Sequence, residues 1–318
     1  MEPKERTTDD VALELLKRMK VGGIESIYDR HQAQQPQCGF GQLALCCRHC
    51  NWGPCNIDPF GKGPKRGVCG ADANTFAARH FLRMAAAGTA SHSDHARAAA
   101  YLLVSVARGE APGYQIKDVE KLMMVAQWLE VKTEGKKVNE IAEEIGNTLL
   151  GEFGKPHGTL LFLKRAPETR QKLWQKLGIA PRAIDREIAE SMHRTSMGTD
   201  QDYRNLVKQA MRVSLADGWG GCMIATEIQD ILFGTPKPVL GKANLGVLKK
   251  DEVNILVHGH EPQLSEAIVI AASDPSLVKA AQAVGAKGIS IAGLCCTANE
   301  LLVRHGNPLA GHMTMQEM

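Results

Sequence analysis

The nine cysteines of this 318-residue chain are the residues whose type and spacing point most directly to chemistry. Six of them fall between Cys38 and Cys69, Cys222 stands alone, and Cys295 and Cys296 are adjacent. So many thiols in one short segment predict metal coordination rather than disulfide bonds if the protein resides in a reducing compartment.

Four of these cysteines have the spacing of an iron-sulfur site. They are Cys47, Cys50, Cys55 and Cys69, in the pattern C-x2-C-x4-C-x13-C. This pattern brings three thiolates into one loop and the fourth from beyond a turn rich in glycine and proline. A structural zinc site more typically has two C-x2-C knuckles, and only one is present. We therefore predict a cubane 4Fe-4S cluster, with zinc as the alternative.

Cys38 and Cys46 remain, and Cys46 is too close to Cys47 for both to bind one cluster. Two cysteine ligands are half of the four that a 4Fe-4S cluster needs. At a two-fold axis, this pair from each of two subunits would supply four thiolates to one cluster. We therefore predict a homodimer with a shared 4Fe-4S cluster. A buried pair, or a two-iron site completed elsewhere, is the alternative.

A third group of metal ligands follows two predicted strands. His258 and His260 lie at the carboxyl end of the first strand, and Cys295 and Cys296 at the carboxyl end of the second. Because ligands gather at that edge of parallel sheets, these side chains are candidates for one metal site. Cys222 has no partner nearby in the sequence, and we expect it to be a small buried apolar residue.

His92 and His95 lie three residues apart, so they share a face if this segment is helical. Imidazoles on one face can relay protons. The alternative is a solvated helix start capped by Ser91 or Ser93. The two residues alone favour this second interpretation.

The elements that must position these residues change along the chain. Residues 9–30 have helical spacing with a break at Gly22 and Gly23. Residues 31–70 are rich in Cys, Gly, Pro and Asn and have little apolar periodicity. We therefore expect metal coordination to supply the stabilisation that a hydrophobic core does not. Residues 71–233 have the period and composition of helices.

Beyond residue 233 the pattern becomes that of a parallel α/β unit. A strand over 253–258, a helical stretch over 263–284, a strand over 288–294 and a helix from Thr297 are expected. Two strands do not complete an α/β domain. The sheet must therefore be short, be completed by a partner, or have been cut off.

These elements predict an α plus α/β fold with two domains. The first is a mostly helical iron-sulfur domain over residues 1–236 that contains the cluster segment 31–70. The second, over residues 237–318, is a truncated Rossmann-like parallel α/β domain.

The composition excludes several classes of protein. A formal net charge of +3 is too small for a nucleic-acid-binding surface. No apolar run approaches the ~20 residues of a membrane-spanning helix, and the N-terminus does not resemble a secretory signal. We expect a cytoplasmic protein.

The motifs of the chain closely resemble those of the anaerobic nickel-iron-sulfur carbon monoxide dehydrogenases. The resemblance runs from about residue 8 to the end and covers the N-terminal half of that family's chains, which continue through the rest of one Rossmann-like domain and a second one. The motifs that carry it are CGFGQLALCCRHCNWGPCNIDPFGKGPKRGVCGA (38–71), HRTSMG (193–198), SLAD (214–217), DILFGTP (230–236), VHGHEP (257–262), GLCCTANE (293–300) and RHGNP (304–308).

The resemblance implies a role for each cysteine of the cluster segment. Cys38 and Cys46 match the ligands of the cluster shared across the dimer axis. The remaining four match the ligands of the electron-transfer cluster within one subunit, and these are Cys47, Cys50, Cys55 and Cys69.

The resemblance also implies active-site roles. His260 and Cys296 match the ligands of the iron that stands outside the cubane of the nickel-containing cluster, with His258 and Cys295 as the other choice. His92 matches the histidine thought to act as acid and base for water and CO2, and with His95 it begins the proposed proton relay.

Two departures from the family stand out. The histidine series is not continued at Ala98 and Tyr101, so we expect slower or rerouted proton exit. The other cysteine ligands of the nickel cluster lie beyond Met318 in the family, so this chain would hold that cluster only in part.

The implied reaction is CO + H2O to CO2, two protons and two electrons, with the electrons passing to a ferredoxin-like acceptor. An acetyl-CoA synthase or a hydrogenase would be a further partner. A non-catalytic iron-sulfur electron-transfer dimer without the nickel site is the alternative function, and a zinc-stabilised interaction module is a third.

Overall fold

The computed structural model describes the chain except for residues 1–5, 260–261, 297–303, 305–308 and 314–318. It divides into two compact units. One contains residues 37–235, and the other combines residues 1–36 with residues 236–318. The first unit is mostly helical, and the second contains the larger of the two small sheets.

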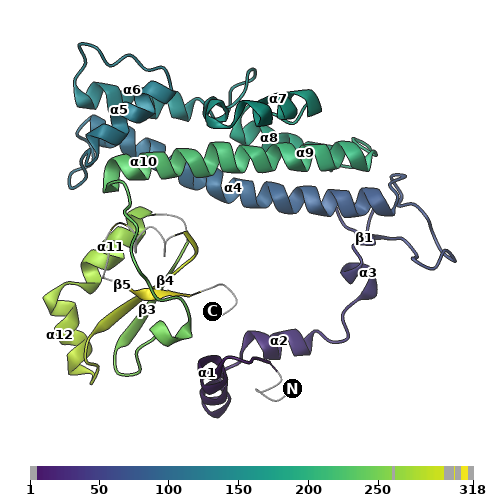
Figure 1. Cartoon of the computed structure of the whole chain (residues 1–318). Coiled ribbons are helices and arrows are strands. Elements are labelled where there is room, and N and C mark those ends of the chain that lie inside the picture. The colour runs from purple at the N-terminus through teal and green to yellow at the C-terminus, as the bar shows by residue number, and fades with distance from the viewer. Residues whose placement is uncertain (1–5, 260–261, 297–303, 305–308, 314–318) are drawn as a thin grey trace. The chain divides into compact units, whose positions relative to one another are not determined.

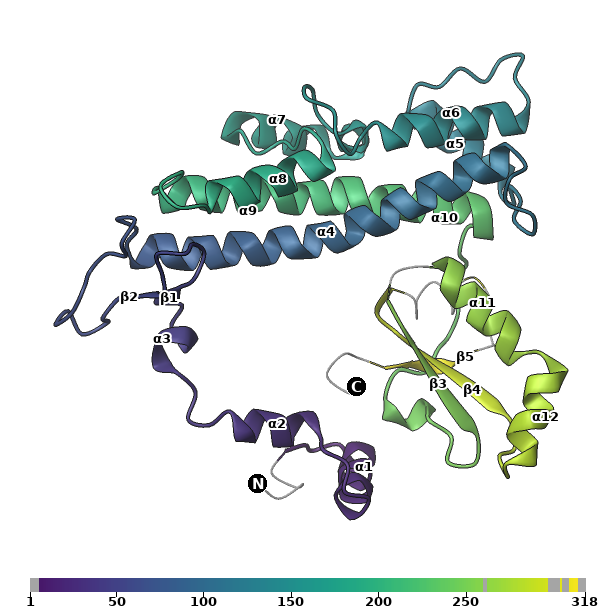
Figure 2. The same ribbon diagram turned by 180° about the vertical axis from the view of Figure 1, so that it is seen from behind.

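The first unit is organised around α4 (Ala73–Ala107), a helix of 35 residues. Asp72 caps its N-terminus by accepting a hydrogen bond from the backbone N–H of Thr75. Three consecutive elements, α9 (Tyr203–Ala216), the π-helical turn η3 (Asp217–Cys222) and α10 (Met223–Phe233), run alongside α4. Figure 2 shows the same pairing from behind. The expectation of a mostly helical stretch over residues 71–233 is confirmed.

Shorter helices complete the unit, and among them α6 and α8 pack most extensively on α4. The main core is formed where these helices meet, and side chains such as Leu103, Ile145 and Ile228 are fully buried there. These shorter elements are α5 (Val119–Trp128), α6 (Val138–Leu150), η2 (Leu161–Arg165), α7 (Glu168–Leu177) and α8 (Ile184–Arg194).

The cysteine-rich stretch, residues 38–70, precedes α4 and has little regular structure. It holds the one-turn helix α3 (Gly39–Gln42) and an antiparallel pair of two-residue strands, β1 (Cys46–Cys47) and β2 (Cys55–Asn56). We call residues 38–70 the cysteine segment. As expected, it has almost no core of its own, because Cys47 and Ile57 are its only buried residues.

The second unit contains a parallel three-stranded sheet in the order β3-β4-β5. The predicted parallel pair is confirmed. The helical stretch between these strands is divided, because Asp274 caps a new helix that begins with Pro275. The third strand was not expected from the sequence. The elements are η4 (Leu245–Val247), β3 (Val253–His258), α11 (Pro262–Ala272), α12 (Pro275–Ala283), β4 (Ile289–Leu294) and β5 (Leu309–Met313).

Two N-terminal helices belong to the same unit. Helix α1 (Asp10–Val21) starts where the sequence indicates, with Asp9 accepting a hydrogen bond from the N–H of Ala12, and α2 (Ile27–Ala33) follows the glycine break. Helix α1 packs on η4. Within the described residues, no helix has the length and apolar character needed to cross a membrane.

Candidate metal and proton-transfer sites

His92 lies in the middle of α4 and is hydrogen-bonded to a carboxylate. Its Nδ1 is 2.6 Å from Oδ1 of Asp217, at the start of η3. Both side chains are about one-quarter exposed. An ionised carboxylate can only accept a hydrogen bond, so this contact places a proton on Nδ1. Nε2 is then the nitrogen with a lone pair that can take a proton.

Cys222 also contacts His92, with Sγ 3.3 Å from Nδ1. The expectation that Cys222 is a buried apolar residue is wrong, since it is only half-buried and sits in a polar group with His92 and Asp217. No local pattern could predict this contact, because Cys222 and His92 are 130 residues apart in the chain.

The π-helical turn explains how Asp217 and Cys222 reach the same histidine. Two residues five apart would lie about 140° apart around an ordinary α-helix. The wider turn of η3 reduces that angle, so both side chains approach His92. Gly221 permits the approach, because a Cβ there would lie 3.0 Å from the backbone carbonyl carbon and oxygen of His92.

His95 lies one turn after His92 on α4 and is buried. Its Nε2 contacts the side-chain amide of Gln229 on α10. The alternative interpretation of His92 and His95 as a solvated helix start is wrong, because α4 begins at Ala73 and both residues lie well inside it. Whether the two histidines relay protons stays a prediction.

The two short strands bring Cys47 and Cys55 together as a cross-strand pair. Cys55 Sγ accepts a hydrogen bond from the backbone N–H of Val68 at 3.5 Å. Backbone N–H groups aimed at sulfur are a common feature of iron-sulfur sites. The segment must pass very close to α4 at Gly67, since a Cβ there would lie 2.8 Å from the Phe76 ring.

Cys69 lies at the end of the segment, against α4. Its Sγ accepts a hydrogen bond from Nη1 of Arg79 at 3.5 Å, and its carbonyl accepts one from Gln201 at 2.9 Å. Burial raises the pKa of the Cys69 thiol, but hydrogen bonds from Arg79 and the Ala71 backbone outweigh it, so the net pKa is lowered. A lowered pKa favours the thiolate, which is the form that binds metal.

Cys38 and Cys46 lie toward the other end of the segment. Cys38 is exposed at the start of α3, and Cys46 is half-buried in β1. The carbonyl of Cys46 lies 2.7 Å from Nε2 of His80, whose Nδ1 is 3.2 Å from Nε2 of His49. Burial, together with Arg83, His80 and Arg79, lowers the pKa of His49 to about 4.

The spacing of the sulfurs bears on the choice between a cubane and zinc. Sulfurs around a tetrahedral zinc ion lie roughly 3.8 Å apart, because each Zn–S bond is about 2.3 Å. Among the described residues, no three cysteine sulfurs lie within 4.8 Å of one another. The described cysteines therefore do not form a preassembled tetrahedral zinc site, and the choice between zinc and a 4Fe-4S cluster stays a prediction.

The described ligands at the strand ends lie where the sequence indicates. His258 ends β3 opposite Leu294, the last residue of β4, and is exposed. Cys295 follows directly with a φ of 55°, and Cys296 is exposed. His260 lies outside the described residues. The structure therefore brings one histidine and both cysteines to the same edge of the sheet.

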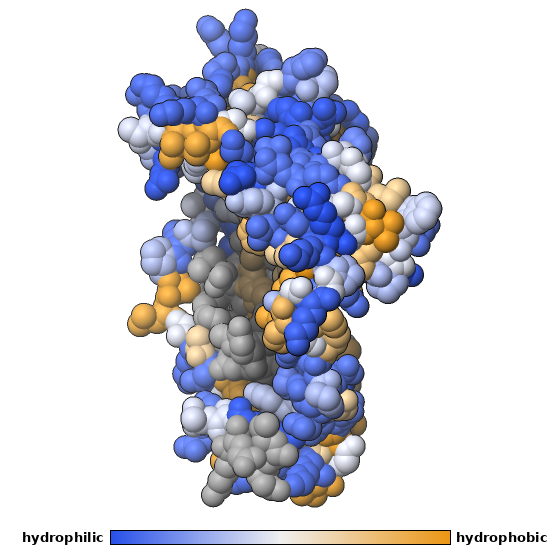
Figure 3. All heavy atoms as spheres, turned by 90° about the vertical axis from the view of Figure 1, so that its right-hand side faces the viewer, coloured by the Kyte–Doolittle hydropathy of each residue, from blue (hydrophilic) through white to orange (hydrophobic). Residues whose placement is uncertain are grey.

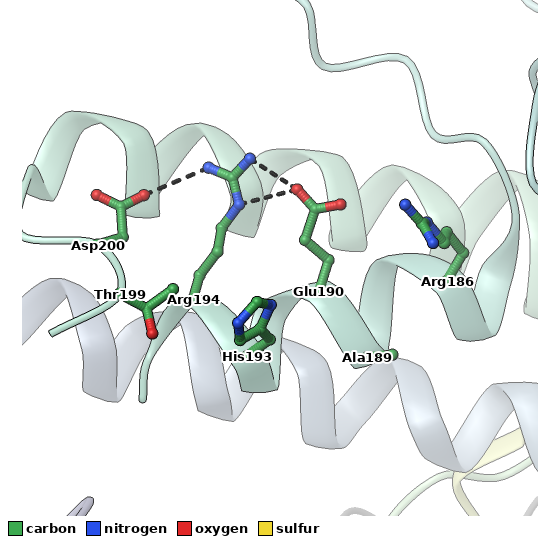
Figure 4. Close-up of a pocket in the computed structure, with 7 residues that line it drawn as sticks. All are labelled: Arg186, Ala189, Glu190, His193, Arg194, Thr199 and Asp200. Atoms are coloured by element: carbon green, nitrogen blue, oxygen red, sulfur yellow. Dashed lines mark hydrogen bonds and ion pairs between the residues drawn. The ribbon is translucent and has the colours of Figure 1, made fainter. Parts of the chain in front are cut away.

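A surface cavity of about 570 Å³ lies elsewhere, along α8 (Figure 4). Arg194 binds Glu190 at 2.6 Å and Asp200 at 3.4 Å within it. Because these acidic and basic groups neutralise each other, the cavity offers no net charge to a ligand. It is lined by Arg186, Ala189, Glu190, His193, Arg194, Thr199 and Asp200.

Comparison with known proteins found similar proteins over almost the whole chain. Residues 45–318 match the Prismane/CO dehydrogenase family. Carbon monoxide dehydrogenase 1 of Methanosarcina mazei is 52% identical over 314 residues, which cover 99% of this chain and 50% of that protein. The carbon monoxide dehydrogenase/acetyl-CoA synthase subunit beta of Moorella thermoacetica is 43% identical, over 100% of this chain and 48% of that protein.

A nickel-free crystal structure of carbon monoxide dehydrogenase from Thermococcus sp. AM4 has the same fold. It superposes with a TM-score of 0.91 at 51% sequence identity, over 98% of this chain and 50% of that chain. The chain thus spans about half the length of the relatives that it matches. On the family match and these identities, the chain belongs to the Prismane/CO dehydrogenase family.

Proposed function

We propose that this chain is part of a nickel-dependent carbon monoxide dehydrogenase that oxidises CO with water to CO2, two protons and two electrons. The observation that carries the proposal is the organisation of α4. This one helix holds His92 against Asp217 and, roughly 20 Å earlier along its axis, holds Arg79 against the cysteine segment. A proton acceptor and an electron-transfer site are thereby fixed on one rigid element.

His92 is the proposed base of the reaction. With Asp217 holding the Nδ1 proton, Nε2 can accept a proton from water and later release it. A nickel-iron-sulfur cluster, when bound, supplies a Lewis acid that lowers the pKa of water and an acceptor for two electrons. His260 and Cys296 would be this chain's ligands to it, with His258 and Cys295 as the other choice.

The cysteine segment is the proposed exit for electrons. Four cysteines would hold a 4Fe-4S cluster within each subunit, and these are Cys47, Cys50, Cys55 and Cys69. Cys38 and Cys46 would hold half of a second cluster, shared in a homodimer. A ferredoxin-like protein would then accept the electrons. The name of the Moorella relative supports an acetyl-CoA synthase as a further partner, and a hydrogenase is the other candidate. We place the enzyme in the cytoplasm.

Exposed apolar side chains support the dimer. Several lie on the cysteine segment and the first turns of α4, where the half-site is: Leu43, Trp52, Phe60, Val68, Phe81 and Met84, all more than half exposed. The face drawn in Figure 3 is mostly hydrophilic, with hydrophobic side chains in separate patches. Apolar groups concentrated on a segment with so little core favour a protein partner there.

The test is CO-dependent reduction of a viologen dye by the native, nickel-loaded protein. We expect His92→Ala to reduce kcat by roughly 10² to 10⁴, the usual contribution of a general base, while nickel and iron contents stay unchanged. His157→Ala is the control, since that histidine is exposed in the stretch between α6 and η2. Full activity in His92→Ala would disprove the role of His92. A wild-type protein that binds no nickel, or that does not oxidise CO when loaded with nickel, would disprove the proposed function.

A further inference from the structure

Arg79 is the bulkiest fully buried side chain among the described residues, with 1% of its surface exposed. A buried cation is costly unless an opposite charge or several hydrogen bonds compensate it. Within the described part of the chain, no carboxylate lies within ion-pair distance of Arg79, and its Nε has no hydrogen-bond partner. The positive charge is therefore poorly compensated by the protein.

The contacts that Arg79 does make point to the cysteine segment. Nη1 donates to Sγ of Cys69 at 3.5 Å, and Nη2 donates to the carbonyl oxygen of Asp200 at 3.2 Å. The loop that carries Asp200 is itself tied to this place, because Gln201 bonds the carbonyl of Cys69 and accepts from Thr75 of α4. The guanidinium is thus held against the sulfur from two sides.

The partner charge is the metal cluster that this segment is proposed to hold. A 4Fe-4S cluster with four thiolates is an anion in both redox states, and reduction by one electron adds one negative charge. A fixed cation beside a ligand sulfur stabilises both states but stabilises the reduced one more, because the attraction grows with the cluster's charge. Burial keeps water from screening this attraction.

We propose that Arg79 tunes the electron-transfer cluster, by placing an otherwise uncompensated buried positive charge against the sulfur of Cys69 and so raising the cluster's reduction potential. This inference rests on the proposed function only for the presence of the cluster. Arg79 is a positioning residue in this scheme, because it acts on the cluster through a ligand and not on the substrate. It makes the cluster a better acceptor for electrons from the active site.

The experiment is a redox titration of the purified native protein under anaerobic conditions, with the paramagnetic signal of the reduced cluster as the readout. Arg79→Met removes the charge and keeps most of the side-chain volume. Arg79→Lys keeps the charge and removes the fork of donors. Arg83→Met is the matched control, since Arg83 lies one turn further along α4 and its Nε donates to Thr195 at 2.9 Å instead of to a sulfur.

We expect Arg79→Met to shift the potential of this cluster to more negative values. The cluster's equilibrium constant for reduction should fall at least tenfold, which corresponds to about 59 mV for one electron. Arg79→Lys should have a potential close to that of the wild type, and Arg83→Met should shift the potential far less than Arg79→Met, because Arg83 donates to Thr195 and not to a ligand sulfur. An Arg79→Met protein with full iron content and an unchanged potential would overturn the proposal.

If Arg79→Met fails to hold the cluster, the lysine variant shows whether the charge or the shape of the arginine is responsible. If Arg79→Lys retains the cluster and its potential, the positive charge is what matters and the proposal stands. If Arg79→Lys loses the cluster to the same extent, the shape of the arginine matters and the proposal fails. A wild-type protein with no reduced-cluster signal would instead refute the proposed function.

Discussion

The cysteine segment and the helical body that it packs against are stabilised in opposite ways. In the body, side chains of α4, α6 and α10 form a continuous apolar core, with Leu103 and Ile145 completely buried. In the cysteine segment, Cys47 and Ile57 are the only buried residues, and the rest is held by hydrogen bonds to backbone and sulfur atoms. One region is stabilised by burial, and the other depends on what its cysteines bind.

The difference has a consequence for how each region responds to damage. Loss of one methylene in the body weakens a packed core by a limited amount. Loss of metal from the segment would leave only scattered hydrogen bonds and one small apolar contact to order it. The two regions should therefore fail independently, and four changes test this from the largest effect to the smallest.

Removal of iron should have the largest effect. After oxidation and chelation of the cluster, we expect amide exchange in residues 38–70 to approach unfolded rates, because so little apolar surface is buried there. Amides of α4 and α9 should stay protected. Hydrogen exchange followed by mass spectrometry measures both, and Cys50→Ala should reproduce the result. A segment that stays protected without iron would contradict the comparison.

Leu103→Ala should destabilise the body by about 2 to 5 kcal/mol, because it leaves a cavity at a fully buried position. The iron content of the cysteine segment should not change. The free energy of unfolding, followed by the helical circular dichroism signal, measures the effect. Tyr101→Ala on the same helix is the control, since Tyr101 is 58% exposed, and its effect should stay within about 0.5 kcal/mol. A comparable loss in both variants would refute a packed core at Leu103.

Gly221→Ala should cost about 1 to 3 kcal/mol, because its Cβ would press against the backbone of His92 at 3.0 Å. Gly218→Ala in the same turn is a close control, since a Cβ there meets nothing within 4 Å. That control should be neutral or stabilising by up to about 1 kcal/mol. Thermal unfolding compares the two variants, and equal stability would show that η3 does not approach α4 as closely as described.

Cys222→Ser should have the smallest effect, within about 0.5 kcal/mol of the wild type. The hydroxyl replaces the thiol in a half-buried polar group with His92 and Asp217, so it does not lack a hydrogen-bond partner. In an apolar core the same change would cost more, because the hydroxyl would be desolvated without a partner. A loss above about 1 kcal/mol in denaturant unfolding would therefore favour the apolar site expected from the sequence.

Local patterns predicted most of the fold. The first helix lies within the predicted residues 9–30 and ends at the predicted glycine break, and β3 and β4 pair in parallel over the predicted residues. The third strand was missed, since five residues from Leu309 have no alternating pattern that distinguishes them from a loop.

The candidate site was predicted only where its residues are close in the sequence. The cysteines of the segment could be grouped by spacing alone. Asp217 and Arg79 could not be assigned to the site in this way, because each contacts its partner only through the packing of helices. Asp217 is 125 residues from His92 in the chain, and Arg79 contacts Cys69 from a separate helix. Asp217 belongs to the motif SLAD, which resembled the family without indicating that its carboxylate binds a histidine.

The π-helical turn η3 also sets the rotation of α10 about its own axis. If the same residues of η3 were wound as an ordinary α-helix, without any deletion, α10 would rotate by about 100° about its axis. Gln229 would turn away from His95, and the carboxylates of Glu227 and Asp230 would leave Lys121. The π-helical winding of this one turn therefore determines which face of α10 is presented to α4.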